Sequence, residues 1–294
     1  MNGWVASSYH IKVAVRDDEA AWLSSGNWQS SNQPPADPLA EQPPDRKWLT
    51  RYNREWHVVI EHAGLARTLA AHLRNDYEHN RGMERGVEEA LPAWPELLVA
   101  EQAVATGADA APTWRYFPPY DAVRRFTVRP LLTPDNYHQH VLALVRGARE
   151  ELLIQNQTFV APKAGEDALR ALVDAVIARQ RAGVRVRIIF RTLLPAQTRR
   201  ELERLKDYGL DLADVRVQVN CHTKGIIVDR RRVLIGSQNW SNHGVSVNRD
   251  ASLLFDDAPL AEYFAAIFEH DWNNLAQPCI GSEWASVEWR SLGR

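Results

Sequence analysis

Apolar residues recur along the second half of the chain with the two spacings that distinguish helices from strands. Helical spacing predicts helices that begin after Pro134 and span 166–182, 199–208 and 258–275. Short apolar or alternating runs predict strands at 152–154, 184–190 and 215–219, and a hairpin with strands 225–228 and 233–235. Strands that alternate with helices indicate an α/β fold, in which helices cover both faces of a mixed or mostly parallel sheet.

A group of polar residues occurs twice in the chain with identical spacing. The first copy consists of His10, Lys12, Asp17, Ser25 and Asn27. The second copy consists of His222, Lys224, Asp229, Ser237 and Asn239. Only five of the 35 Lys and Arg residues are lysines, yet two of them occupy the matching Lys position. A repeat that reproduces reactive side chains, including a compact ammonium group, indicates a site built from two parts.

The similarity between the two copies continues beyond this group. The segment Asn53-Arg54-Glu55 and the residues up to Asn80 align without a gap on Asn248-Arg249-Asp250 and the residues up to Leu275. Each copy therefore carries one further acidic residue, Glu55 or Asp250. This longer match indicates a duplicated structural unit rather than a chance recurrence of a short motif.

The duplicated group resembles the HxKx4Dx6GSxN signature, or HKD motif, of the phospholipase D superfamily. The second copy fits every fixed position, including Gly236, whereas the first copy has Ser24 where the family usually has Gly. The resemblance covers both copies and their acidic segments. It implies an α-β-α sandwich made of two pseudo-symmetric repeats with mixed sheets.

Cleavage of a phosphodiester without a metal requires a nucleophile, a proton for the leaving oxygen and positive groups around the phosphoryl oxygens. One imidazole can attack phosphorus and a second can protonate the alkoxide, so the two copies must face one another. The resemblance implies a covalent phosphohistidine that water or another alcohol resolves, without a cofactor or metal ion. It assigns His10 as the nucleophile and His222 as the general acid, but the symmetry of the repeats leaves the reverse assignment open.

The remaining residues of the two copies fit roles around the same phosphate. Lys12 and Lys224 are expected to hold nonbridging oxygens, and the Ser25, Ser237, Asn27 and Asn239 side chains are expected to donate hydrogen bonds to them. Glu55 and Asp250 are expected to fix the histidine tautomers. By resemblance, Asp17 and Asp229 brace the adjoining loops.

The repeat also suggests a division of the chain. We expect residues 1–80 to form the C-terminal part of repeat one with a Pro-rich loop at 29–52, residues 81–124 a connector, residues 125–275 a complete second repeat, and residues 276–294 a tail. Only nine residues precede His10, whereas predicted helices and strands precede His222. We therefore expect repeat one to be incomplete and the natural protein to extend about a hundred residues further upstream.

Composition narrows the classes of function. The net charge of −2 gives no overall attraction to nucleic acid, and no apolar run approaches the roughly 20 residues that cross a bilayer. Cys221 and Cys279 are too few for a disulfide framework, and the sequence contains no acidic or Cys/His metal cluster. The sequence does not determine the oligomeric state, and it favours a cytoplasmic or peripheral-membrane location.

Three functions remain in competition. The favoured one is a phospholipase D or phosphatidyltransferase that acts on a glycerophospholipid, possibly at a membrane surface. Its rival is a metal-independent endonuclease, which requires a basic groove such as one formed by Arg185, Arg187, Arg191, Arg199 and Arg231. The third is a non-catalytic fragment.

Two neighbours of the motifs have simpler structural interpretations. Trp28 and Trp240 follow the paired Asn residues and are expected to pack beneath the site, with contact of one of them with a substrate head group as the alternative. Cys221, directly before His222, is expected to be a buried structural residue rather than a nucleophile.

Overall fold

The computed structural model describes residues 8–32, 52–81, 117–191 and 195–279. Most of the expected connector, most of the Pro-rich loop and nearly all of the expected tail lie outside these ranges.

The central element is a mixed eight-stranded sheet with the order β11-β7-β6-β5-β8-β9-β10-β4. Its strands are β4 (Thr127–Thr133), β5 (Glu151–Asn156), β6 (Arg185–Arg191), β7 (Val215–Gln218), β8 (Lys224–Val228), β9 (Arg232–Gly236), β10 (Asp250–Asp256) and β11 (Gln277–Pro278). Only β5, β6 and β7 run parallel to one another, and the other neighbouring pairs are antiparallel. The sheet is therefore mixed, which is one of the two forms expected from the sequence, the other being a mostly parallel sheet.

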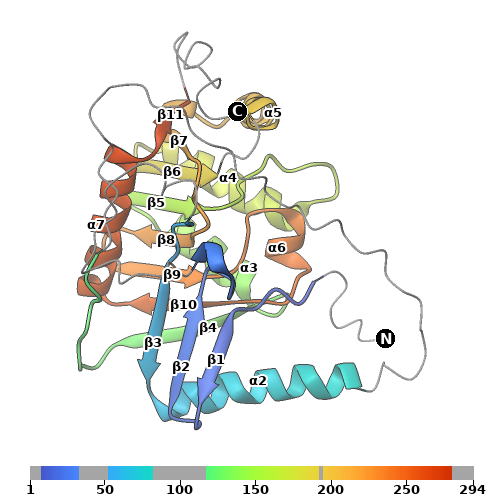
Figure 1. Cartoon of the computed structure of the whole chain (residues 1–294). Coiled ribbons are helices and arrows are strands. Elements are labelled where there is room, and N and C mark those ends of the chain that lie inside the picture. The colour runs from blue at the N-terminus through green and yellow to red at the C-terminus, as the bar shows by residue number, and fades with distance from the viewer. Residues whose placement is uncertain (1–7, 33–51, 82–116, 192–194, 280–294) are drawn as a thin grey trace.

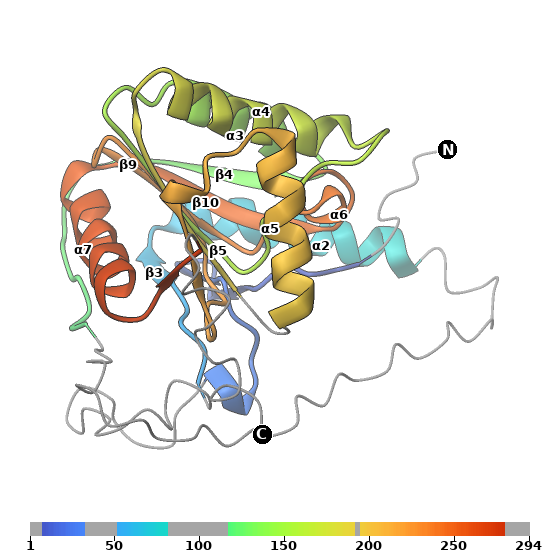
Figure 2. The same cartoon turned by 90° about the horizontal axis from the view of Figure 1, so that it is seen from above.

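Helices cover both faces of this sheet (Figures 1 and 2). On one face lie α3 (Tyr137–Arg146), α4 (Asp167–Arg181) and α5 (Pro195–Tyr208), and on the other lies α7 (Ala258–Asn274). Alternation along the strands divides the core accordingly: Leu152 and Ile154 of β5 pack towards α3 and α4, whereas Leu153 packs towards α7. A short helix, α6 (Asn242–Ser246), follows the second motif.

A second, three-stranded antiparallel sheet packs on the same face as α7. It consists of β1 (Val13–Arg16), β2 (Ala20–Ser24) and β3 (His57–Glu61), followed by α2 (Ala63–Arg81) (Figure 1). Apolar residues of this sheet, such as Leu23 and Ile60, share one core with Phe264 of α7. A 3-10 turn at Ser30–Asn32 follows β2, and another at Leu212–Asp214 precedes β7.

The small sheet and α2 repeat the arrangement of β8, β9, β10 and α7. The β1–β2 hairpin turns through Asp17 and Asp18, and the β8–β9 hairpin turns through Asp229 and Arg230, with positive φ at all four residues. The structure thus confirms the predicted α-β-α sandwich with two related halves. The division of the chain at residues 80, 125 and 275 stays a proposal.

Strands β4, β10 and β11 of the large sheet, and all three strands of the small sheet, were not predicted from the apolar pattern. β4 contains Pro130, which normally argues against a strand, but β4 is the edge of the sheet, where a missing N–H group is tolerated. β10 begins and ends with an acidic residue, Asp250 and Asp256, and pairs with both β9 and β4. At the opposite edge β11 also contains a proline, so the first residues of the expected tail belong to the sheet.

Candidate functional site

The two motif histidines are held by backbone contacts between the halves. Tyr9 forms an isolated parallel bridge with Arg249, and Cys221 forms the equivalent bridge with Arg54. As a result, the His10 N–H group donates to the Arg249 carbonyl (2.8 Å) and the His222 N–H group donates to the Arg54 carbonyl (3.1 Å). Each histidine is therefore positioned by the Asn-Arg-acid segment of the opposite half.

The acidic residues are exchanged in the same way. Nδ1 of His10 lies 2.7 Å from Oδ1 of Asp250, and Nδ1 of His222 lies 2.7 Å from Oε1 of Glu55. Both acids thus reach a histidine, and in each case it is the histidine of the other copy. Because Nδ1 faces the acid, Nε2 of each imidazole is the nitrogen left for chemistry.

The motif serines lie behind these acids. Ser25 donates to Glu55 (3.2 Å) and accepts the N–H group of Trp56, and Ser237 donates to Asp250 (2.5 Å) and accepts the N–H group of Ala251. Both serines are fully buried. In this geometry their hydroxyl groups fix the carboxylates, and hydrogen bonds from them to a phosphate stay a prediction.

The two lysines enter the site from opposite halves. Lys12 Nζ donates to the His10 carbonyl (2.5 Å), and burial lowers its pKa to about 8. Lys224 Nζ donates to the Ser25 carbonyl (3.1 Å) and to Oε1 of Gln157 (2.7 Å). Burial, with Lys12 nearby, lowers the pKa of Lys224 to about 7, although Glu55 opposes this shift.

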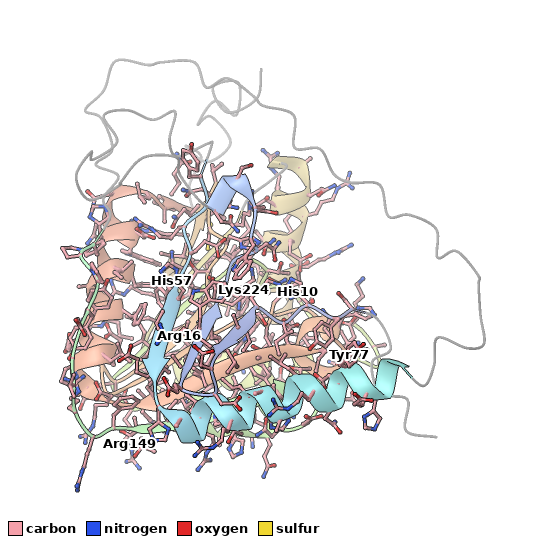
Figure 3. All side chains as sticks on the ribbon, turned by 60° about the horizontal axis from the view of Figure 1, so that its bottom comes forward. His10, Arg16, His57, Tyr77, Arg149 and Lys224 are labelled. Atoms are coloured by element: carbon pink, nitrogen blue, oxygen red, sulfur yellow. The ribbon has the colours of Figure 1, made fainter. Side chains whose placement is uncertain are left out.

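His222 is surrounded by positive groups. Its pKa is lowered to about 2, first by burial and then by the charges of Lys224, Arg191, Lys12 and His10. Burial raises the pKa of Glu55 to about 7. Since His10 and Lys12 both act on the His222 ring, the fold brings the two motifs into one site (Figure 3).

The other motif residues take different positions. Asn27 is exposed, and Asn239 has a buried Oδ1 atom with no hydrogen-bond partner within the described ranges. Asp17 and Asp229 lie at the hairpin turns, at the far ends of β1 and β8 from the histidines. The Asp229 carboxylate accepts the backbone N–H groups of residues 149–151, at 2.8 to 3.1 Å, and so braces the turn before β5.

The first copy has Ser24 at the usual glycine position and a glycine, Gly26, two residues later. A Cβ atom on Gly26 would lie 1.6 Å from Oε2 of Glu55, so only glycine leaves room for this acid. Ser24 Oγ accepts the Gly26 N–H group (2.9 Å). In the second copy the glycine is Gly236, where a Cβ atom would lie 1.7 Å from Ser252 Oγ, and Gln238 takes the position of Gly26.

A Gly26→Ala variant is expected to lose at least about 10²-fold in kcat/KM with little loss of stability. The Glu55 carboxylate is the end of a flexible side chain, so it moves away from His222 while the backbone stays in place. Steady-state kinetics and thermal unfolding measure the two effects. Ser24→Gly, which introduces the residue usual in the family, is the matched control and should stay within a few-fold of the parent. Unchanged kinetics in Gly26→Ala would contradict a role for Glu55 at this position.

Two buried ion pairs, which were not predicted from the sequence, fix the acidic segments. Arg54 binds Asp271 of α7 through two hydrogen bonds of 2.9 Å, and Arg249 binds Asp76 of α2 through bonds of 2.8 and 2.7 Å. Each arginine again reaches the helix of the opposite half. The two ion pairs could have been predicted from the repeat, because the gap-free alignment that pairs Arg54 with Arg249 also pairs Asp76 with Asp271.

The arginines considered for a nuclease groove have mixed surroundings. Arg185 and Arg187 pair with Glu151, and Arg187 also pairs with Glu269. Arg191 lies near His222 and Glu55 and has no ion pair within the described residues. Arg185 and Arg187 thus lie in ion pairs, whereas Arg191 lies beside the candidate site. A continuous groove from the five arginines to His222 stays a prediction of the nuclease interpretation.

The predictions for the flanking residues have different outcomes. Trp240 is buried as expected, but Trp28 is 73 % exposed, and its ring lies 5.4 Å from that of Trp22 between centroids. The exposure of Trp28 contradicts the prediction that it packs beneath the site. It fits the alternative, contact with a substrate head group, which stays a prediction. Cys221 is fully buried, and burial raises its pKa to about 12, as expected for a structural thiol.

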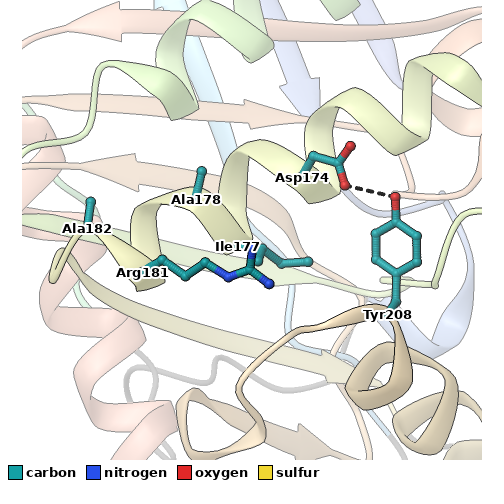
Figure 4. Close-up of a pocket in the computed structure, with 6 residues that line it drawn as sticks. All are labelled: Asp174, Ile177, Ala178, Arg181, Ala182 and Tyr208. Carbon is teal, nitrogen blue, oxygen red and sulfur yellow. Dashed lines mark hydrogen bonds between the residues drawn. The ribbon is translucent and has the colours of Figure 1, made fainter.

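Other features of the described residues lie apart from the motifs. A cavity of about 430 Å³ lies between α4 and α5, where Tyr208 donates to Asp174 (2.8 Å), and no motif residue lines it (Figure 4). Within the ranges that the structure describes, there is no His, Cys, Asp and Glu cluster suited to a metal ion. The same ranges contain no helix long and apolar enough to span a membrane.

Comparisons with known proteins agree with this architecture. A family model described as "Cardiolipin synthase, PLD-like domain" matches residues 141–272. Mitochondrial cardiolipin hydrolase from Xenopus tropicalis is 28 % identical over 143 residues, which are 49 % of this chain and 64 % of that relative. The phosphatidylserine synthase structure from Haemophilus influenzae superposes with a TM-score of 0.55 at 16 % identity, covering 95 % of this chain and 64 % of that one, and shows the same fold.

The match to a further relative covers a larger share of that relative's length. Phospholipase D from Rickettsia felis is 32 % identical over 183 residues, covering 62 % of this chain and 86 % of the relative. With the sandwich fold and the paired histidines, this match identifies the family. The chain belongs to the phospholipase D superfamily.

Proposed function

We propose that this protein is a metal-independent phosphodiesterase that hydrolyses or transphosphatidylates glycerophospholipids through a phosphohistidine. The observation that carries the proposal is the crossed pair of imidazoles, each with Nδ1 at 2.7 Å from an acid of the opposite half. Two such rings, with Lys12 and Lys224 beside them, supply a nucleophile, a general acid and the positive charge that phosphoryl transfer requires.

We assign His222 as the nucleophile and His10 as the general acid, the reverse of the assignment that the family resemblance implies. Burial and the cations around His222 lower its pKa and keep its Nε2 lone pair available for attack. The His10 side chain is 25 % exposed, against 7 % for His222, so it exchanges protons with solvent more readily. A general acid must later take a proton from the incoming water or alcohol, and His10 is the better placed for this exchange.

The proposed reaction has two steps. Nε2 of His222 attacks phosphorus, and the bond to the leaving alcohol breaks as His10 transfers its proton to the departing oxygen. Water or a second alcohol then gives a proton to His10 and attacks the phosphohistidine, which releases the product and restores His222. Lys12, Lys224 and the Asn27 and Asn239 amides stabilise the charge on the phosphoryl oxygens in both steps.

Two observations favour a lipid as the substrate. Curated relatives are cardiolipin hydrolases and a phospholipase D. Trp28, which directly follows Asn27, is 73 % exposed, and tryptophan is enriched where proteins meet the membrane interface. We propose that the protein acts on lipid at a membrane surface, with no requirement for a metal cofactor.

A parallel assay tests the proposed function. The protein is incubated in chelator with vesicles of phosphatidylcholine or phosphatidylglycerol plus ethanol, and separately with plasmid DNA. We expect phosphatidylethanol to form and the plasmid to stay intact, and Lys224→Ala to give no product. Cleaved plasmid without lipid turnover would replace the lipid substrate with nucleic acid, and no turnover of either would favour a non-catalytic protein.

A further inference from the structure

A second cavity, of about 230 Å³, opens directly beside the candidate active site. Gln157 lines this cavity, and its Oε1 atom accepts a hydrogen bond from Lys224 Nζ at 2.7 Å. Arg191, at the end of β6, also lines it and lies near enough to His222 and Glu55 to shift the pKa of both. Through Gln157 and Arg191 the wall of the cavity therefore adjoins Lys224 and His222 of the candidate site.

Arg191 has an unusual environment for a partly buried guanidinium. Its Nε atom is buried without a hydrogen-bond partner, and no ion pair joins its side chain to any residue in the described part of the chain. Nearby arginines differ, since Arg185, Arg187 and Arg230 all pair with Glu151. A partly buried guanidinium that has no ion pair and whose Nε–H group has no acceptor fits an anionic ligand, because its planar fork of N–H groups matches the oxygens of a phosphate or carboxylate.

The other walls of the cavity limit what it can hold. Phe159 and Phe190 provide apolar surface, and Glu201 is occupied by the Ala161 N–H group (2.6 Å) and by Arg204 (3.5 Å). The volume lies below the roughly 300–1,000 Å³ of pockets for drug-sized ligands. A small polar group fits this space, whereas an acyl chain does not.

We propose that Arg191 and this cavity form a head-group subsite that binds a phosphate ester on the alcohol side of the lipid substrate. The proposal rests on the proposed function and makes it narrower: the preferred substrates carry a second phosphate near the scissile one. Arg191 binds this second phosphate, while Lys12 and Lys224 hold the phosphate that reacts.

The test compares two lipids that differ by one phosphate, phosphatidylglycerol and phosphatidylglycerol phosphate, in mixed micelles of matched surface charge. The measured quantity is the ratio of their kcat/KM values. We expect the parent protein to prefer the phosphorylated lipid by at least tenfold. In Arg191→Gln this preference should be lost, mainly through KM, and in Arg191→Lys it should be partly restored. The matched control Arg200→Gln removes the same charge from the exposed surface of α5, outside the cavity, and should keep the preference.

Each other outcome overturns a defined part of the proposal. A parent ratio near one, or a preference that survives in Arg191→Gln, removes the subsite while lipid turnover still supports the proposed function. An equal loss on both lipids in Arg191→Gln places Arg191 at the reacting phosphate instead. If the parent protein cleaves neither lipid, the proposed function fails and the subsite fails with it.

Discussion

A His10→Ala variant is expected to release one equivalent of p-nitrophenol from a p-nitrophenyl phosphodiester in a rapid burst, whereas His222→Ala releases none. p-Nitrophenolate departs without a proton, so loss of the general acid leaves the first step intact while loss of the nucleophile abolishes it. With a natural lipid, whose alkoxide needs a proton, each variant should lose about 10³-fold or more in kcat/KM. Stopped-flow absorbance measures the burst, and mass spectrometry of the quenched His10→Ala protein should locate the phosphoryl group on His222.

Two comparisons make this result decisive. His79→Ala removes an exposed histidine of α2 and should behave as the parent protein. The double variant should be little worse on lipid than either single variant, because residues that act as one unit are not additive. A burst in His222→Ala with the label on His10 would reverse our assignment and restore the order that the resemblance implies.

An Asp271→Ala variant is expected to lose about 3–5 kcal/mol of unfolding free energy, because it leaves Arg54 buried without its partner. Arg54 is 6 % exposed and Asp271 fully buried, and Asp271 also accepts a hydrogen bond from Gln155 at 2.9 Å. Asp76→Ala should have a smaller effect, because Arg249 keeps a second acidic partner, Asp135, at 2.7 Å. Urea unfolding followed by circular dichroism gives the free energies.

The control is a pair of the same charges at the surface. Arg16 and Glu61 lie 3.7 Å apart with side chains 68 % and 81 % exposed, so Glu61→Ala should change stability by no more than about 1 kcal/mol. An Arg54→Met/Asp271→Leu double variant, which replaces both charges with apolar groups, should regain much of the lost stability. Equal losses in Asp271→Ala and Glu61→Ala would contradict a stabilising role for the buried pair.

The sequence predicted most of the architecture because the elements of the second half carry strong periodic patterns. Helices α3, α4, α5 and α7 and the central strands lie where the apolar spacing placed them. The edge strand β4 escaped prediction because Pro130 is acceptable only at an edge, and which strand is the edge is a property of the assembled sheet. Strand β10 escaped prediction because its apolar residues directly follow Asp250, and this segment was interpreted only as part of the repeat.

The sequence predicted which residues form the candidate site but not which acid contacts which histidine. The repeated motif identified both histidines, both lysines and both acids, yet alignment of two copies cannot say whether an acid serves its own copy or the other one. That information depends on how the halves meet. The lack of an ion pair at Arg191 is also a property of the folded protein, because Glu151 and Glu269 bind other arginines, Arg187 and Arg230. The exposure of Trp28 likewise depends on the conformation of the loop after β2 and not on residue type.

The exchange of acids between the halves restricts how the protein can change over time. A substitution at Glu55 alters the imidazole of the second motif, and one at Asp250 alters that of the first. Neither half can therefore adapt to a new ester by adjusting its own ring alone. We expect the halves to diverge in concert, with compensating replacements that appear on opposite sides of the pseudo-twofold axis.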